Sequence, residues 1–179
     1  MSKRVLVLSS SPRKGGNSDL LCDEFLRGAL EAGHRAEKLR VAEQRIAYCT
    51  GCGACTRKKG ACSQRDDMAA VLQKMVEADV LVLATPVYFY TMAAQMKTLI
   101  DRCCARYQEI RDKEFYFILA AADHSRPAMT RTLEEFRGFT SCLDGAREKG
   151  VVYGTGAWNV GDIQGSPALD QAYRMGLKA

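Results

Sequence analysis

The chain has 179 residues, of which 47% are hydrophobic and 26% charged, and its formal net charge at pH 7 is +5. This length fits one domain with a sizeable core, and the modest, scattered positive charge favours small anionic ligands over nucleic acid. Since no apolar run is long enough to cross a membrane or to serve as a signal peptide, we expect a soluble cytoplasmic protein without a membrane partner.

The first predicted element is a buried strand at Val5–Leu8, followed by a loop of small and polar residues, SSSPRKGGNS, at 9–18. Four consecutive apolar residues are typical of a strand buried on both faces of a parallel sheet. An amphipathic helix follows over about 20–30, and the free N–H groups at a helix start bind anions such as phosphate. Serine hydroxyls, the Asn17 amide and the Arg13 guanidinium can donate to phosphate oxygens. The alternative is a surface turn.

The remaining elements alternate between strands and helices. Strands are predicted at 36–40, 80–84, 115–122 and 151–154, and helices at 66–78, 92–104, around 133–143 and at 167–177. This alternation predicts an α/β fold with a doubly wound parallel sheet of five strands in the order 2-1-3-4-5. In that order the ligand crevice lies at the carboxyl ends of strands one and three, so the loops at 9–18 and 85–90 should meet.

The second of these loops, TPVYFY at 85–90, combines a turn-restraining proline with three aromatic residues. Residues after Pro86 can lie along a planar ring, but Tyr88, Phe89 and Tyr90 can equally be core or interface aromatics. The spacing alone does not decide between these interpretations.

Four cysteines, Cys49, Cys52, Cys55 and Cys62, have the spacing C-x2-C-x2-C-x6-C. Four thiolates on short loops can hold a [4Fe–4S] cluster or a tetrahedral zinc ion, and free or disulfide-bonded cysteines are the alternative. The basic residues 57–59 would offset the negative charge of such a centre. The other cysteines, Cys22, Cys103, Cys104 and Cys142, fall in helical patterns and are predicted to pack in the core.

Several of these stretches resemble one known superfamily. SSPRKGGNSDLL is similar to the flavin phosphate loop of the flavodoxin-like NAD(P)H-dependent FMN reductases, which include the iron–sulfur flavoproteins and multimeric flavodoxins. The cysteine segment, DDM at 66–68, TPVYFYTMAAQMKTLIDR at 85–102 and GDIQGSPALDQAYRMG near the C-terminus are also similar. The chain departs from the family pattern at Ser10, where glycine is usual, and at 122–125, where a glycine-rich loop is usual.

The resemblance implies a flavodoxin-like domain over 1–179 with a cysteine-rich insertion at about 41–65. It implies FMN as cofactor, NAD(P)H as co-substrate and a homodimer or homotetramer. The expected FMN contacts are Ser9, Ser11, Arg13, Gly16, Asn17, Ser18, Thr85, Pro86, Val87, Tyr88, Phe89 and Asp123. Because FMN carries the chemistry, no side chain is predicted to be catalytic.

Two functions of different classes follow. The first is an NAD(P)H-dependent oxidoreductase that passes electrons through FMN to a quinone, a flavin or another small acceptor. The second is an electron carrier, in which a [4Fe–4S] cluster on the four clustered cysteines receives an electron from a ferredoxin-like donor. A zinc-stabilised binding domain is a non-redox alternative.

Overall fold

The computed structural model describes residues 1–57 and 60–179 of the chain. Its sheet has five parallel strands in the order β2-β1-β3-β5-β6, which confirms the predicted fold class and strand order, and a short additional strand, β4. The strands are β1 (Arg4–Ser9), β2 (Arg35–Arg40), β3 (Val80–Tyr88), β4 (Thr91–Met92), β5 (Glu114–Ala120) and β6 (Arg147–Gly154).

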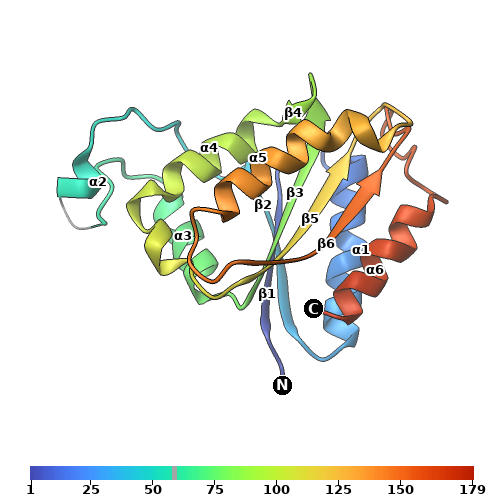
Figure 1. Ribbon diagram of the computed structural model, residues 1–179, viewed down its shortest axis with the longest axis horizontal. Coiled ribbons are helices and arrows are strands. Elements are labelled where there is room, and N and C mark those ends of the chain that lie inside the picture. Colours follow the sequence, from blue (N-terminus) through green and yellow to red (C-terminus); the bar gives the residue numbers. More distant parts are fainter. Residues whose placement is uncertain (58–59) are drawn as a thin grey trace.

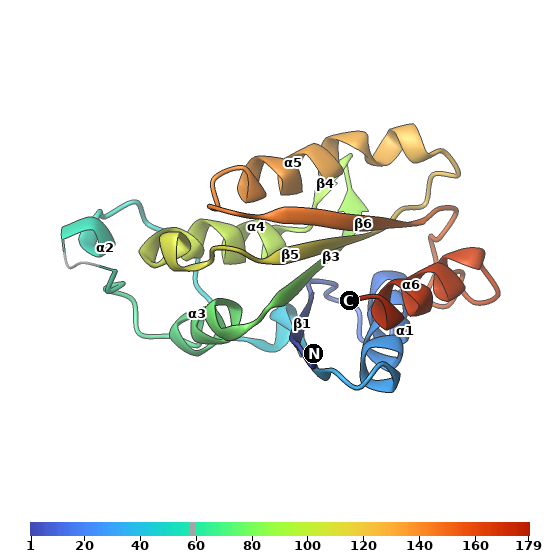
Figure 2. The same ribbon diagram turned by 60° about the horizontal axis from the view of Figure 1, so that its bottom comes forward.

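Helices cover both faces of the sheet (Figures 1 and 2). One face carries α1 (Asn17–Glu31) and α6 (Pro167–Leu177), and the other carries α3 (Met68–Glu77), α4 (Ala94–Arg102) and α5 (Thr130–Thr140). Four 3-10 turns join these elements: η1 (Val41–Glu43), η2 (Cys103–Ala105), η3 (Tyr107–Glu109) and η4 (Arg126–Met129). None of the helices in the described part of the chain is long and apolar enough to cross a membrane.

The two cores explain the apolar sequence of β3. Leu81 and Leu83 belong to the cluster under α3, α4 and α5, whereas Val80, Val82 and Ala84 belong to the cluster under α1 and α6. All five side chains are fully buried. A strand covered on both faces has no polar face, which is why β3 reads as a continuous apolar run.

The chain after β3 differs from the sequence prediction. The strand continues through Pro86 to Tyr88 and pairs with β4 in an antiparallel hairpin, with Val87 opposite Met92. Helix α4 therefore begins at Ala94 and not at Met92. Both backbone N–H groups before the helix are bound by side chains, Met92 by Glu135 at 2.8 Å and Ala93 by Thr85 at 2.9 Å, which fixes where the helix starts.

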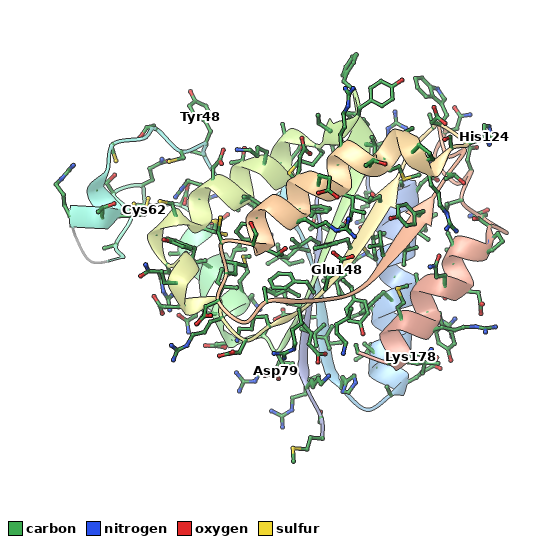
Figure 3. The ribbon with its side chains drawn as sticks, viewed as in Figure 1. Tyr48, Cys62, Asp79, His124, Glu148 and Lys178 are labelled. Carbon is green, nitrogen blue, oxygen red and sulfur yellow. The ribbon has the colours of Figure 1, made fainter. Side chains whose placement is uncertain are left out.

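Of the cysteine-rich segment at 41–65, Val41 is buried in the core, whereas the described part around α2 (Ala54–Arg57) projects from one end of the molecule (Figure 1). Helix α2 has a single turn. The aromatic residue of the segment, Tyr48, is exposed, and Figure 3 shows Tyr48 and Cys62 on this projection, far from His124 at the opposite end of the molecule.

Candidate flavin-binding site

A cleft of about 870 Å³ opens at the carboxyl edge of the sheet, where the loops after β1, β3, β5 and β6 meet. This is the position at which doubly wound folds bind their ligands. Ten of the twelve residues expected to contact FMN line the cleft, and Ser9 and Thr85 do not. Among the described residues, the lining consists of Ser11, Arg13, Gly16, Asn17, Ser18, Pro86, Val87, Tyr88, Phe89, Tyr90, Thr91, Met92, Ala94, Ala120, Ala121, Ala122, Asp123, Ala128, Ala157 and Trp158.

The start of α1 forms the polar end of the cleft. Gly16 occupies the N-cap position, and no side chain among the described residues caps this helix. A Cβ atom on Gly16 would lie 2.9 Å from Ser11 Oγ and 3.0 Å from the Arg13 carbonyl oxygen, so only glycine allows the loop to close this tightly. The uncapped N–H groups of the first turn, with the exposed guanidinium of Arg13 beside them, suit a phosphate.

Asp19 braces the loop from below. The buried carboxylate accepts hydrogen bonds from Ser9 Oγ at 2.7 Å, the Gly15 amide at 3.0 Å and Lys38 Nζ at 3.2 Å. Burial raises the pKa of Asp19, but the bonds from Ser9, Gly15 and Lys38 outweigh it, and the pKa lies below its ordinary value. Ser9 is therefore bound to this carboxylate under the loop, which is why it does not line the cleft.

Ser10 shows why serine can replace the glycine usual in the family. Its backbone N–H and its Oγ both donate to the Ala84 carbonyl oxygen, at 3.0 and 2.8 Å. Its φ angle is not positive, so the turn does not need glycine, and its side chain holds the loop against the end of β3.

The β3–β4 hairpin forms an aromatic wall. Phe89 and Tyr90 adopt positive φ angles of 50° and 65°, which are uncommon for aromatic residues, and Phe89 is 98% exposed. Buried Thr85 supports the hairpin from behind, because its Oγ1 accepts from the Ala93 amide and donates to the Pro86 carbonyl oxygen. Thr85 thus shapes the wall without lining the cleft.

The loop after β6 is the part of the site that the sequence analysis did not identify. Ala157 and Trp158 line the cleft, and Arg13 Nη1 donates to the Trp158 carbonyl oxygen at 3.0 Å. The side-chain amide of Asn17 is bound to this loop, because Nδ2 donates to the Asn159 carbonyl oxygen at 2.7 Å and Oδ1 accepts from two backbone amides, Gly161 at 3.1 Å and Ile163 at 3.2 Å. The sequence did contain a signal for this loop. The loop follows the last predicted strand, so it had to lie at the carboxyl edge of the sheet, and it carries the chain's single tryptophan.

The four motif cysteines lie on the projecting segment. Cys49, Cys52 and Cys62 are exposed and Cys55 is partly buried. Among residues 1–57 and 60–179, no three histidine, cysteine, aspartate or glutamate side chains lie close enough together to hold a metal ion. The thiols as they lie therefore do not fit a cluster. Of the basic run, Lys58 and Lys59 lie outside the described residues.

Two of the other cysteine predictions are wrong. Cys22 and Cys103 are buried as expected, but Cys104 and Cys142 are exposed. Helix α4 ends at Arg102, and the tighter η2 turn that follows directs Cys104 outward, where its Sγ lies 4.0 Å from Cys55 Sγ. Cys142 lies beyond the end of α5.

Cys52 and Cys62 have different surroundings. Hydrogen bonds from Ser63 Oγ, at 3.4 Å, the Ala54 amide and the Thr50 side chain lower the pKa of Cys52 to about 7. Cys62 instead lies 3.6 Å from Nη2 of Arg102.

Arg102 anchors the base of the segment. The buried guanidinium donates to both carboxylate oxygens of Asp66, at 2.6 and 2.9 Å, and to the Ala47 carbonyl oxygen at 2.6 Å. The hydrogen bonds from Arg102 hold the pKa of Asp66 below its ordinary value. The end of α4 therefore ties together the two flanks of the cysteine segment.

A doubly wound sheet with an uncapped helix start and an apolar wall at one crevice is an arrangement that suits a mononucleotide. Residues 3–145 match the family of NADPH-dependent FMN reductases, and the chain belongs to this family of oxidoreductases. The match confirms the resemblance found in the sequence.

Individual proteins similar to this chain are also named as flavoproteins or FMN-containing oxidoreductases. The chain is 46% identical to an iron-sulfur flavoprotein of Archaeoglobus fulgidus over 99 residues, which are 55% of this chain and 44% of the relative. It is 24% identical over 184 residues, 96% of each chain, to a Bacillus subtilis protein named as an NAD(P)H-dependent FMN-containing oxidoreductase. The chain spans about half the length of the iron-sulfur flavoproteins that it matches.

The fold is also that of known structures. The NAD(P)H:quinone oxidoreductase of Methanothermobacter marburgensis superimposes with a TM-score of 0.78 at 17% identity, covering 99% of this chain and 97% of that one. At this identity the likeness shows the flavodoxin-like fold alone.

Proposed function

We propose that the chain binds FMN in the cleft and works as an NAD(P)H-dependent oxidoreductase that passes electrons to a small acceptor such as a quinone or a flavin. The observation that carries this proposal is the combination, in one cleft, of the uncapped start of α1 with the apolar wall of the β3–β4 hairpin. A phosphate needs the first feature and a flat apolar ring needs the second.

In this proposal, the residues of the chain bind FMN and orient it. When bound, FMN supplies the hydride and electron transfer chemistry. The α1 start and Arg13 would hold the phosphate, while Pro86, Val87 and the Ala120–Ala122 stretch, which also line the cleft, would lie against the ring and limit its contact with water. The cleft volume of about 870 Å³ lies within the usual range for ligand pockets.

The test compares FMN with riboflavin, which lacks the phosphate. We expect FMN to bind much more tightly, because the charge-assisted contacts at the α1 start are lost with riboflavin. Anaerobic NADH or NADPH should then bleach the visible absorption of the oxidised flavin, with a rate constant of about 1–1000 per second, as is typical of enzymes. Equal affinity for the two flavins would contradict the phosphate assignment, and flavin that stays oxidised would contradict the nicotinamide assignment.

We further propose that the chain assembles as a homodimer or homotetramer. Exposed aromatic side chains gather at the rim of the cleft: Phe89 is 98% exposed, Trp158 71% and Tyr90 54%. Contiguous exposed apolar surface marks association sites. Light scattering should give a mass of two or four chains, and Phe89→Ser should shift it towards one chain; a monomeric wild type would contradict the proposal.

A second candidate function is an iron–sulfur flavoprotein electron carrier with a ferredoxin-like donor. It is favoured by the 46% identity to the Archaeoglobus fulgidus iron-sulfur flavoprotein and by the spacing of Cys49, Cys52, Cys55 and Cys62. Since the thiols are not assembled in the described structure, loading a cluster requires the segment to rearrange. Iron, sulfide and zinc assays on anaerobically purified protein, with its absorption spectrum, separate this carrier from a zinc protein and from a protein with FMN alone.

A further inference from the structure

Cys104 is a fifth cysteine at the projecting segment, outside the C-x2-C-x2-C-x6-C motif. Its Sγ lies 4.0 Å from Cys55 Sγ, although the two residues are 49 positions apart in the sequence. Cys104 is exposed and Cys55 partly buried, so small reagents can reach the pair. A disulfide joins its sulfurs at about 2.05 Å, so the two sulfurs need to approach by only about 2 Å.

The fold holds this pair together on both sides of Cys55. On one side, Gly60 packs against η2 so closely that a Cβ atom on it would lie 3.1 Å from the Ala105 carbonyl oxygen. On the other side, Arg102 binds the Ala47 carbonyl oxygen. The proximity of Cys55 and Cys104 therefore results from how the segment is attached to α4 and η2.

We propose that Cys55 and Cys104 form a reversible disulfide that fastens the cysteine segment to the end of α4. The oxidant is a low-molecular-weight disulfide such as oxidised glutathione. One protein thiolate attacks its S–S bond and releases one glutathione, and the second thiolate attacks the mixed disulfide and releases the other. Two protein thiols are oxidised, one glutathione disulfide is reduced, and the two protons go to the released glutathione thiolates.

The crosslink has a consequence for metal binding. With Cys55 in the disulfide, three of the four motif thiols remain, so the crosslinked chain cannot offer the complete motif to a cluster or a zinc ion. This consequence rests on the second candidate function, whereas the crosslink itself does not. The segment would thus have two exclusive states, a closed disulfide and an open set of thiols.

The crosslink is tested on the full chain, freed of metal and equilibrated in glutathione buffers of increasing oxidised fraction. Alkylation and peptide mass mapping should show that Cys55 and Cys104 lose reactivity together and that a peptide joined at these two residues appears. Cys104→Ser should remove this peptide, and its Cys55 should carry either a free thiol or a mixed disulfide with glutathione and be joined to no other residue of the chain. Cys142→Ser, a change at an exposed cysteine on another element, should leave the crosslink intact.

Two results would overturn the crosslink: Cys104 that stays alkylatable in the oxidised wild type, or Cys55 joined instead to Cys49, Cys52 or Cys62. The metal consequence is tested by anaerobic zinc uptake, because the sulfide needed to build a cluster would itself reduce a disulfide. Oxidised wild type should lose most of the zinc uptake of the reduced chain, and oxidised Cys104→Ser, shown by mass to carry no glutathione, should retain it. Equal zinc uptake by oxidised and reduced wild type would overturn the exclusion. If the reduced chain takes up neither zinc nor, with added sulfide, iron, the second candidate function fails, while the peptide map still decides the crosslink.

Discussion

At the scale of single residues, Asn17 and Arg13 lie side by side in the cleft but have different roles. Asn17 binds three backbone groups of the 159–163 loop and is 8% exposed, whereas Arg13 is exposed and makes one bond to that loop. Asn17→Ala leaves two amides without their acceptor, and we expect it to lower the free energy of unfolding by about 1–3 kcal/mol. Urea denaturation without FMN measures this.

Arg13→Ala is the matched change. Because an exposed side chain contributes little to folding, its free energy of unfolding should stay within about 0.5 kcal/mol of wild type. Its affinity for FMN should fall, since a charge-assisted bond to the phosphate is lost. If both variants unfold like wild type, the role of Asn17 as a brace between the two loops is wrong.

Asp19 makes the stability of the folded chain depend on pH. Its pKa is lower in the folded chain than its ordinary value, so the folded state binds the proton less readily than the unfolded state. The stability that the carboxylate contributes is complete above the unfolded pKa, about 3.9, and is lost as the pH falls through the lower folded pKa. Urea midpoints measured below about pH 4 should fall more steeply for wild type than for Asp19→Asn. Parallel curves would show that Asp19 is not held as a carboxylate.

At the scale of elements, α1 and α6 touch through facing glycines. A Cβ atom on Gly28 of α1 would lie 2.1 Å from the Tyr173 carbonyl oxygen, and one on Gly176 of α6 would lie 2.1 Å from the Phe25 carbonyl oxygen. These neighbours are backbone atoms, so the helices must separate to admit a methyl group. We expect Gly28→Ala to destabilise the fold by about 1–3 kcal/mol or more in thermal unfolding.

Gly138→Ala in α5 is the control for that change, because no atom of the described residues, apart from its chain neighbours and the backbone of its own helix, lies within 4 Å of the added methyl group. It should stabilise the chain by about 0.5–1 kcal/mol, since alanine favours helix more than glycine. Equal melting temperatures for Gly28→Ala and Gly138→Ala would show that α1 and α6 are not in backbone contact.

The elements also show what the sequence can and cannot predict. Val80–Ala84 was predictable as a strand because burial on both faces leaves a continuous apolar run. The β3–β4 hairpin was not, because it depends on positive φ angles at Phe89 and Tyr90, which no local pattern indicates. The outward position of Cys104 was missed because a helical period does not show that α4 ends at Arg102. Similarly, the spacing of the cysteines in the sequence shows which thiols are available to a metal, but it does not show how far apart they lie in the folded chain.

At the scale of the whole molecule, the cleft and the cysteine segment are separate. The cleft lies at the carboxyl edge of the sheet, and its lining includes none of the described residues of 41–65. The part of the segment around α2 projects from one end of the molecule (Figure 1). Helix α4 lies between them, since it begins beside the hairpin and ends at Arg102, which binds Asp66 and Ala47.

This separation predicts that the four motif cysteines can be removed without loss of the flavin site. A variant with Cys49, Cys52, Cys55 and Cys62 all changed to serine keeps both members of the Arg102–Asp66 pair and every residue that lines the cleft. Its FMN affinity, measured by quenching of flavin fluorescence, should therefore equal that of wild type, and any bound iron should be lost. Arg13→Ala, which leaves the segment intact, should lower the FMN affinity and leave any bound iron in place. If the serine variant binds FMN weakly, the segment contributes to the flavin site, for instance by reaching the cleft of a second chain in the proposed oligomer.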